Sequence, residues 1–152
     1  MVFEVRIDFL RKYQAWKFQQ KCLTESVVYK ATVTDTSNNK IIATYIGLTE
    51  GPFKDRYNGH NSNFNSTNPK TQNATTLSTF IHECKKSNIE TKITWTILKK
   101  SQKYQTGSRR CQLCLTEKLE ILKDNDPLNL NQRSELLGKC RHCTNHKLKK
   151  VK

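Results

Sequence analysis

The chain has 152 residues, enough for one domain with at most a small appendage. Only 35% of the residues are apolar, so the core must be compact and a bound metal would help to stabilise it. Lysine and arginine number 27 against 13 acidic residues, and the resulting net charge of +14 favours a polyanionic partner, most commonly nucleic acid. No apolar run is long enough to span a membrane.

The first twenty residues carry several charges, which interrupt any signal-peptide core. We therefore expect a nuclear or cytoplasmic protein that is not secreted. In those compartments the six cysteines would be reduced thiols, available to a metal rather than joined in disulfides.

Residues 1–21 form the first predicted segment, a helical extension. Its apolar side chains follow the helical period at Phe9, Leu10, Tyr13 and Trp16. Such a helix could dock on the domain or belong to a larger protein, and the pattern leaves both readings open.

Two strands are predicted next. Apolar and polar residues alternate over 27–33, and a second strand covers 41–47, where its final glycine frees the backbone to turn sharply. The polar run 35–40 joins the two strands as an antiparallel hairpin. Tyr29 and Tyr45 then lie on the same small sheet, close to the open end of the hairpin.

A short polar helix is predicted to start near Pro52. On it Arg56 and His60 are four residues apart and share a face. With Tyr45 at a strand end, this face makes a pocket suited to a phosphate. The alternative is a core tyrosine beside a solvated basic helix.

Residues 61–76 are rich in Asn, Ser and Thr and are predicted to be a loop. A helical stripe follows, with Cys84 as a small core residue rather than a metal ligand, at Leu77, Phe80, Ile81 and Cys84. A third strand is predicted from alternation over 93–97, and a basic loop over 99–110.

The last long helix is predicted over 113–124, with a core stripe of three leucines, Leu115, Leu119 and Leu122. Glu117 lies off this stripe, between Leu113 and Ile121 at i−4 and i+4. A carboxylate flanked by apolar residues is partly screened from water and can hold a divalent cation. The competing reading is an ordinary helix-surface glutamate. A final short helix is predicted over 131–137.

One set of residues has the chemistry for phosphodiester hydrolysis, which needs a base for the attacking water and positive charge on the phosphate. A tyrosine or histidine (Tyr29, Tyr45 or His60) can handle the proton, and the Arg56 guanidinium can bind the phosphoryl oxygens. Glu117 can hold Mg²⁺ or Mn²⁺, because water and substrate oxygens complete the shell of such an ion.

A second set has the spacing of a structural zinc site. Cys111 and Cys114 form a CxxC motif, and further Cys and His residues follow after a helix-sized gap. Because a closed four-ligand site leaves no position for water, the zinc would be structural and would clip the helix of Glu117 to the C-terminal region. Two pairs compete for the remaining positions: Cys140 with His142, or Cys143 with His146. The alternative is a set of unmetallated core cysteines.

The order of several motifs resembles the GIY-YIG nuclease domain: Val27-Val28-Tyr29, Tyr45-Ile46-Gly47, Arg56-x-x-x-His60, Glu117 and Asn131. Longer stretches are similar to the endonuclease domain of Penelope-like retroelements, at 22–31, 111–118 and 131–142. The resemblance covers 22 to about 148, which would make 22–148 the nuclease domain and 149–152 a basic tail. Two departures are Val27 in place of the first-motif glycine, and the absence of cysteines from 3–21.

The resemblance implies a small antiparallel sheet flanked by helices. With the three predicted strands and the zinc spacing, we expect an α+β fold with a small three-stranded antiparallel sheet and a C-terminal zinc clip. The resemblance implies that Tyr29 is the general base and that Tyr45 helps to orient the water. Arg56 would stabilise phosphate charge, and His60 would assist proton transfer or contact the phosphate.

The resemblance also implies that Glu117 ligates the catalytic metal and that Asn131 supports the site by a hydrogen bond. The expected activity is single-metal DNA cleavage that primes reverse transcription; a full element carries a reverse transcriptase domain, which these residues do not include. The expected partner is DNA, or structured RNA, bound through basic side chains of Lys54, Arg109, Arg110, Lys139, Arg141 and Lys147. The alternatives are an inactive DNA- or RNA-binding module that keeps the nuclease fold, and a zinc-ribbon-like interaction protein.

Overall fold

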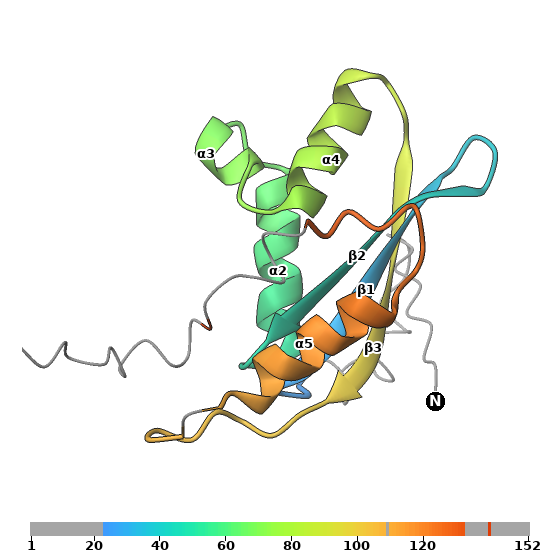
Figure 1. Ribbon diagram of the computed structural model, residues 1–152. Coiled ribbons are helices and arrows are strands. Elements are labelled where there is room, and N and C mark those ends of the chain that lie inside the picture. Colours follow the sequence, from blue (N-terminus) through green and yellow to red (C-terminus); the bar gives the residue numbers. More distant parts are fainter. Residues whose placement is uncertain (1–22, 109, 133–139, 141–152) are drawn as a thin grey trace, which may run out of the picture.

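The computed structural model describes residues 23–108, 110–132 and 140 (Figure 1). Three antiparallel strands form one sheet in the order β2-β1-β3, and helices pack on both of its faces. The predicted α+β class and the three-stranded antiparallel sheet are therefore confirmed. The predicted extension 1–21, the tail 149–152 and most of the predicted helix 131–137 lie outside the described residues.

The central strand β1 (Val27–Asp35) pairs with β2 (Lys40–Thr49) through the predicted hairpin and with β3 (Thr91–Lys100) on its other side. The Asp35 carboxylate accepts hydrogen bonds from the backbone N–H and hydroxyl of Ser37, which stabilises the turn. The prediction that the second strand ends at its glycine is wrong, because β2 continues through Gly47 to Thr49.

Two helices cover one face of the sheet, α2 (Phe53–Phe64) and α4 (Thr76–Lys86), with the short α3 (Pro69–Gln72) between them. The loop predicted over 61–76 is thus wrong in part. The side chain of Phe64 is buried and anchors the last turn of α2, and Asn68 caps α3, so local polarity is overridden by packing and capping. A capping box of Thr75 and Ser78 starts α4.

The core on this face is centred on Trp95 of β3, whose ring lies 5.8 Å from that of Tyr57 and 5.2 Å from that of His60, between ring centroids. Cys84 is buried in α4, as predicted for a core residue. The aromatic rings therefore pack the helix that carries Arg56 and His60 directly against the sheet.

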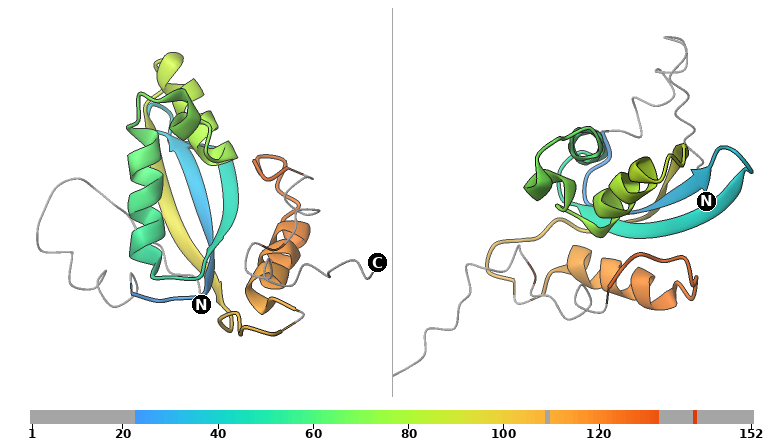
Figure 2. Two further views of the ribbon diagram at one scale, coloured as in Figure 1. Left: turned by 90° about the vertical axis from the view of Figure 1, so that its left-hand side faces the viewer. Right: turned by 90° about the horizontal axis from the view of Figure 1, so that it is seen from above.

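Helix α5 (Gln112–Lys123) covers the opposite face, which Figure 2 shows in the view from above. The predicted leucine stripe is wrong: Leu115, Leu119 and Leu122 are exposed, whereas Leu113 and Ile121 are buried against Val28 and Ile46 of the sheet. The helix carries two apolar stripes, and periodicity alone does not tell which one meets the sheet. Because Glu117 is one turn from both Leu113 and Ile121, it lies on the buried side.

The chain after α5 returns to the free edge of β2. The backbone N–H of Thr44 donates to the Leu128 carbonyl, and the N–H of Leu130 donates to the Thr44 carbonyl, both at 2.8 Å. This short parallel pairing places the residues that follow beside the tyrosine-bearing part of β2. Within the part of the chain that the structure describes, no helix is both long and apolar enough to cross a membrane.

Candidate active site and candidate metal centre

The hydroxyl of Tyr29 is the centre of the first candidate site. Arg56 Nε donates a hydrogen bond to it at 3.1 Å, and it shares a second hydrogen bond of 2.7 Å with His60 Nε2, whose direction depends on the histidine tautomer. Arg56 and His60 are one turn apart on α2, so the structure brings together the face predicted from their spacing. Tyr29 lies on β1 and has no exposed surface.

Gly47 makes this arrangement possible. It lies directly opposite Tyr29 in the β1–β2 register, and a Cβ at this position would lie 2.6 Å from the Tyr29 hydroxyl oxygen. Any side chain here would therefore displace the tyrosine. The sequence indicated a turn at this glycine, but its role is to leave room for the ring that crosses it.

Tyr45 lies beside the same cluster. Its ring meets that of His60 edge-on, with centroids 6.2 Å apart, and it is 5% exposed. Burial alone would lower the pKa of Arg56. The hydrogen bonds and charge interactions of Arg56 with Tyr29 and Tyr45 outweigh this effect, so the pKa of Arg56 is raised. The guanidinium is therefore charged at any physiological pH.

Burial sets the protonation of the other members. It raises the pKa of Tyr29 to about 12, an effect that the neighbouring Arg56 opposes and the charge of Glu117 increases. Burial, with a smaller contribution from Arg56, lowers the pKa of His60 to about 3. At neutral pH the site thus contains a neutral phenol, a neutral imidazole and one guanidinium.

Glu117 joins this group from the opposite helix layer. It is half-buried on α5, and its charge reaches the Tyr29 hydroxyl, since it contributes to the pKa of that group. The negative charge of Glu117 thus adds, as the smallest of the contributions, to the raised pKa of Tyr29. A half-buried carboxylate suits a hard divalent cation that keeps most of its water ligands.

His60 is less accessible than the sequence suggested. It is 1% exposed, its Nε2 is engaged by Tyr29, and its Nδ1 has no hydrogen-bond partner within the described residues. The His60 ring, like that of Tyr29, therefore has almost no contact with solvent in this conformation. Its hydrogen bond to the Tyr29 hydroxyl places it to act on that tyrosine rather than on solvent.

Asn131 binds the backbone of strand β2 next to Tyr45. Its side-chain oxygen accepts from the Ile46 N–H, and its amide donates to the Ile46 carbonyl, both at 2.8 Å. The side chain thus pairs with the edge of β2 as another strand would. Ile46 lies between Tyr45 and Gly47, so this contact fixes the backbone next to the candidate site.

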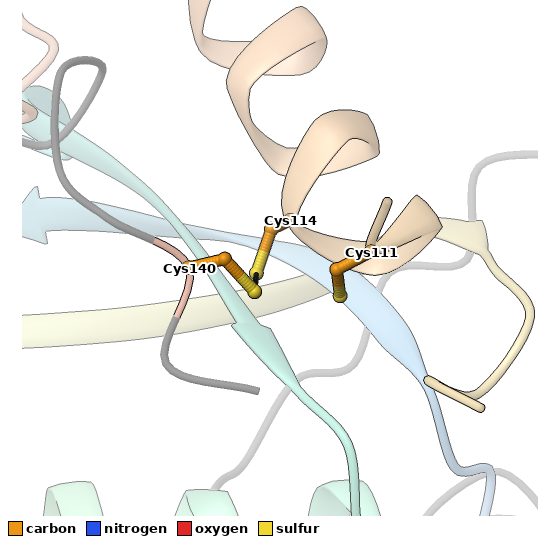
Figure 3. A group of neighbouring side chains, drawn as sticks. All are labelled: Cys111, Cys114 and Cys140. Carbon is orange, nitrogen blue, oxygen red and sulfur yellow. Dashed lines mark hydrogen bonds between the residues drawn. The ribbon is translucent and has the colours of Figure 1, made fainter. Parts of the chain in front are cut away.

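The second candidate site is a cluster of three thiols, shown in Figure 3. Cys111 precedes α5 as its N-cap, Cys114 lies in the first turn, and Cys140 approaches from far along the chain. Their sulfur atoms all lie within 4.8 Å of one another, and the Sγ atoms of Cys114 and Cys140 are 3.2 Å apart.

This thiol cluster could hold a metal ion such as zinc, because zinc binds cysteine sulfur in closed tetrahedral sites. Burial, together with the neighbouring thiols, raises the pKa of Cys114, so a thiolate there needs a cation to stabilise it. The other expected ligands, His142, Cys143 and His146, lie outside the described residues, which leaves the fourth ligand open.

Of the side chains expected to bind nucleic acid, Lys54 on α2 and Arg110 before α5 are exposed to solvent. Arg109, Lys139, Arg141 and Lys147 lie outside the described residues. No family model, no curated protein and no solved structure matches this chain.

Proposed function

We propose that this protein is a metal-dependent DNA endonuclease of the GIY-YIG type, derived from the endonuclease domain of a Penelope-like retroelement. The observation that carries the proposal is the Tyr29 hydroxyl, which is bonded to both Arg56 and His60 and lies within the electrostatic reach of Glu117. These are four of the residues on which the motif resemblance rests, and they come from three separate elements.

Arg56 is the proposed phosphate-binding group. It is permanently charged, and its planar fork matches the oxygens of a phosphodiester. In the free protein its Nε is bonded to Tyr29. A phosphate that recruits the guanidinium would compete for this bond and leave the tyrosine oxygen free to accept a proton from the attacking water.

Tyr29 is the proposed general base, and His60 positions it. With a pKa of about 12 the phenol is protonated at rest, so it can take a proton from water only as it gives its own to an acceptor. The neutral His60 Nε2, 2.7 Å away, is placed to accept the proton that Tyr29 gives up, and would carry it until the leaving oxygen takes a proton. Tyr45, beside them, would help to orient the water.

A divalent cation held by Glu117, when bound, would supply positive charge for the leaving oxygen. Mg²⁺ and Mn²⁺ fit a site with one carboxylate, because they retain water ligands. The thiol cluster has different chemistry: sulfur favours zinc, and we assign it a structural role at the start of α5.

The test is nicking of supercoiled plasmid with Mg²⁺ or Mn²⁺ by the wild-type protein and by Glu117→Gln, which keeps the shape and removes the charge. Glu83→Gln, an equal charge change at an exposed position of α4, is the control. We expect Glu117→Gln to lose at least a hundredfold in rate and the control to be unaffected. Equal cleavage by all three proteins would refute the assignment, and binding without cleavage by the wild type would favour an inactive binding module.

A further inference from the structure

An open pocket of about 490 Å³ lies where the chain enters β1 and leaves β3. Its walls are two short segments, 23–26 before β1 and 100–103 after β3. The Ser101 N–H donates to the Ser26 carbonyl at 2.7 Å, which joins the two walls. Ser26 is buried in the left-handed backbone region (φ 54°), a conformation that costs energy for a residue other than glycine and is commonly found near functional sites.

The pocket lies at the same end of the sheet as the tyrosine cluster. Lys100 pairs with Val27, two residues before Tyr29 on the same strand. Two residues along a strand span about 7 Å, and neighbouring strands are about 5 Å apart. The backbone of Lys100 thus lies roughly 9 Å from that of Tyr29, on the side of β1 away from Gly47.

The polar groups of the pocket suit an anion. Lys100 and Lys103 extend from one wall and are largely exposed, and Ser101 adds a hydroxyl beside them. Lys103 forms an ion pair with Glu25 of the other wall, whereas Lys100 forms no ion pair within the described residues. The walls therefore carry two cations, of which one is neutralised by a carboxylate that an incoming anion would displace.

We propose that this pocket binds a backbone phosphate of DNA next to the phosphodiester at Arg56, with Lys100 as the main contact and Glu25 as a competitor for Lys103. The proposal rests on the proposed function, because it requires that the DNA strand bound at Arg56 continues over the end of β1. A phosphate held here would fix the register of the strand relative to Tyr29 without reading its sequence.

The experiment measures binding of a fluorescein-labelled duplex of twenty base pairs by anisotropy, without Mg²⁺ or Mn²⁺, at several salt concentrations. All variants are made in the full chain with Glu117→Gln as background. Lys100→Ala is compared with Lys40→Ala, an exposed lysine at the opposite end of the sheet. Loss of one phosphate contact reduces the slope of log K against log salt by about 0.9, which is about eightfold in affinity at 0.1 M salt. We expect this change for Lys100→Ala and not for Lys40→Ala.

Glu25→Gln should change DNA affinity in the opposite direction to Lys100→Ala. It frees Lys103 for the phosphate, so the duplex should bind more tightly than to Glu83→Gln, which removes the same charge elsewhere. Equal effects of Lys100→Ala and Lys40→Ala, or of the two glutamine variants, would overturn the proposal. Failure of the proposed function is separate: a wild-type protein that binds through Lys100 but never nicks DNA refutes the nuclease, whereas one that nicks DNA with Lys100 irrelevant refutes only the phosphate pocket.

Discussion

The burial of His60 predicts a specific dependence of stability on pH. The pKa of His60 is about 3 in the folded protein and near 6.5 in the unfolded chain, so folding favours the neutral ring. The contribution of His60 to stability is fully present above pH 6.5 and is lost progressively as pH falls, until it is gone below about pH 3. Each pH unit within that window removes about 1.4 kcal/mol.

At pH 5 the unfolded histidine is almost fully protonated and the folded one is neutral. The loss relative to pH 7.5 is therefore about 1.5 pH units, or about 2 kcal/mol, and it depends on the unfolded pKa rather than on the depth of the folded one. For a domain of this size that is a large part of a total stability of about 5–15 kcal/mol.

The assay is urea unfolding at pH 7.5 and pH 5 for the wild type and His60→Gln. The glutamine amide can meet the Tyr29 hydroxyl at the Nε2 position but does not titrate. Other groups titrate in both proteins, so the difference between the two pH dependences isolates His60. We expect the wild type to lose about 2 kcal/mol more than the variant between the two pH values. Equal losses, or a His60 ring that titrates near pH 6.5 by NMR in the folded wild type, would refute the burial argument.

Two further predictions concern packing around Gly47 and metal binding by the thiol cluster. Gly47→Ala places a Cβ 2.6 Å from the Tyr29 hydroxyl oxygen, and this overpacking should lower the free energy of unfolding in urea by about 1–3 kcal/mol. The control is Gly59→Ala on α2, where the new Cβ meets nothing within 4 Å, and it should be neutral or stabilising. Equal effects of the two substitutions would contradict the close approach at Gly47. Cys114→Ser should abolish the retention of one equivalent of zinc per chain, measured by atomic emission after dialysis, and Cys84→Ser should retain it; zinc kept by both variants would show that the thiol cluster is not the site.

The strands and most helices could be predicted from local patterns. Alternation around Tyr29 and Trp95 reflects the deeper burial of one face of each strand, and the i, i+3, i+4 spacing around Ile81 reflects one buried helix face. The pairing of Arg56 with His60 could also be predicted, because residues one turn apart on a helix share a face whatever the helix packs against.

The features that failed depend on contacts between distant residues. Nothing local distinguishes the exposed leucines of α5 (Leu115, Leu119 and Leu122) from the buried Leu113 and Ile121. The sheet that selects the buried pair meets them through Val28 and Ile46, from the first half of the chain. The role of Gly47 depends on its being opposite Tyr29 in the register, and the depth at which His60 is buried depends on Trp95. Each of these is a tertiary constraint on a residue whose local signal was ambiguous.

The position of α5 explains why a metal in the thiol cluster would matter to the tyrosine site, although the cluster does not touch that site. The helix buries only Leu113 and Ile121 against the sheet, a small apolar contact for an element of twelve residues, and helices in proteins are stabilised mainly by such packing. Its C-terminal end is tied to β1 by an ion pair of 2.9 Å between Lys30 and Asp124.

At the other end of α5, Leu113 is buried against the sheet, and the thiol cluster adds a link to Cys140. A metal there would fix the first turn as the ion pair fixes the last. Glu117 lies between these two points, and its charge acts on Tyr29 only while the helix stays in place. Loss of the metal should therefore weaken the coupling between the carboxylate and the tyrosine before it unfolds the sheet.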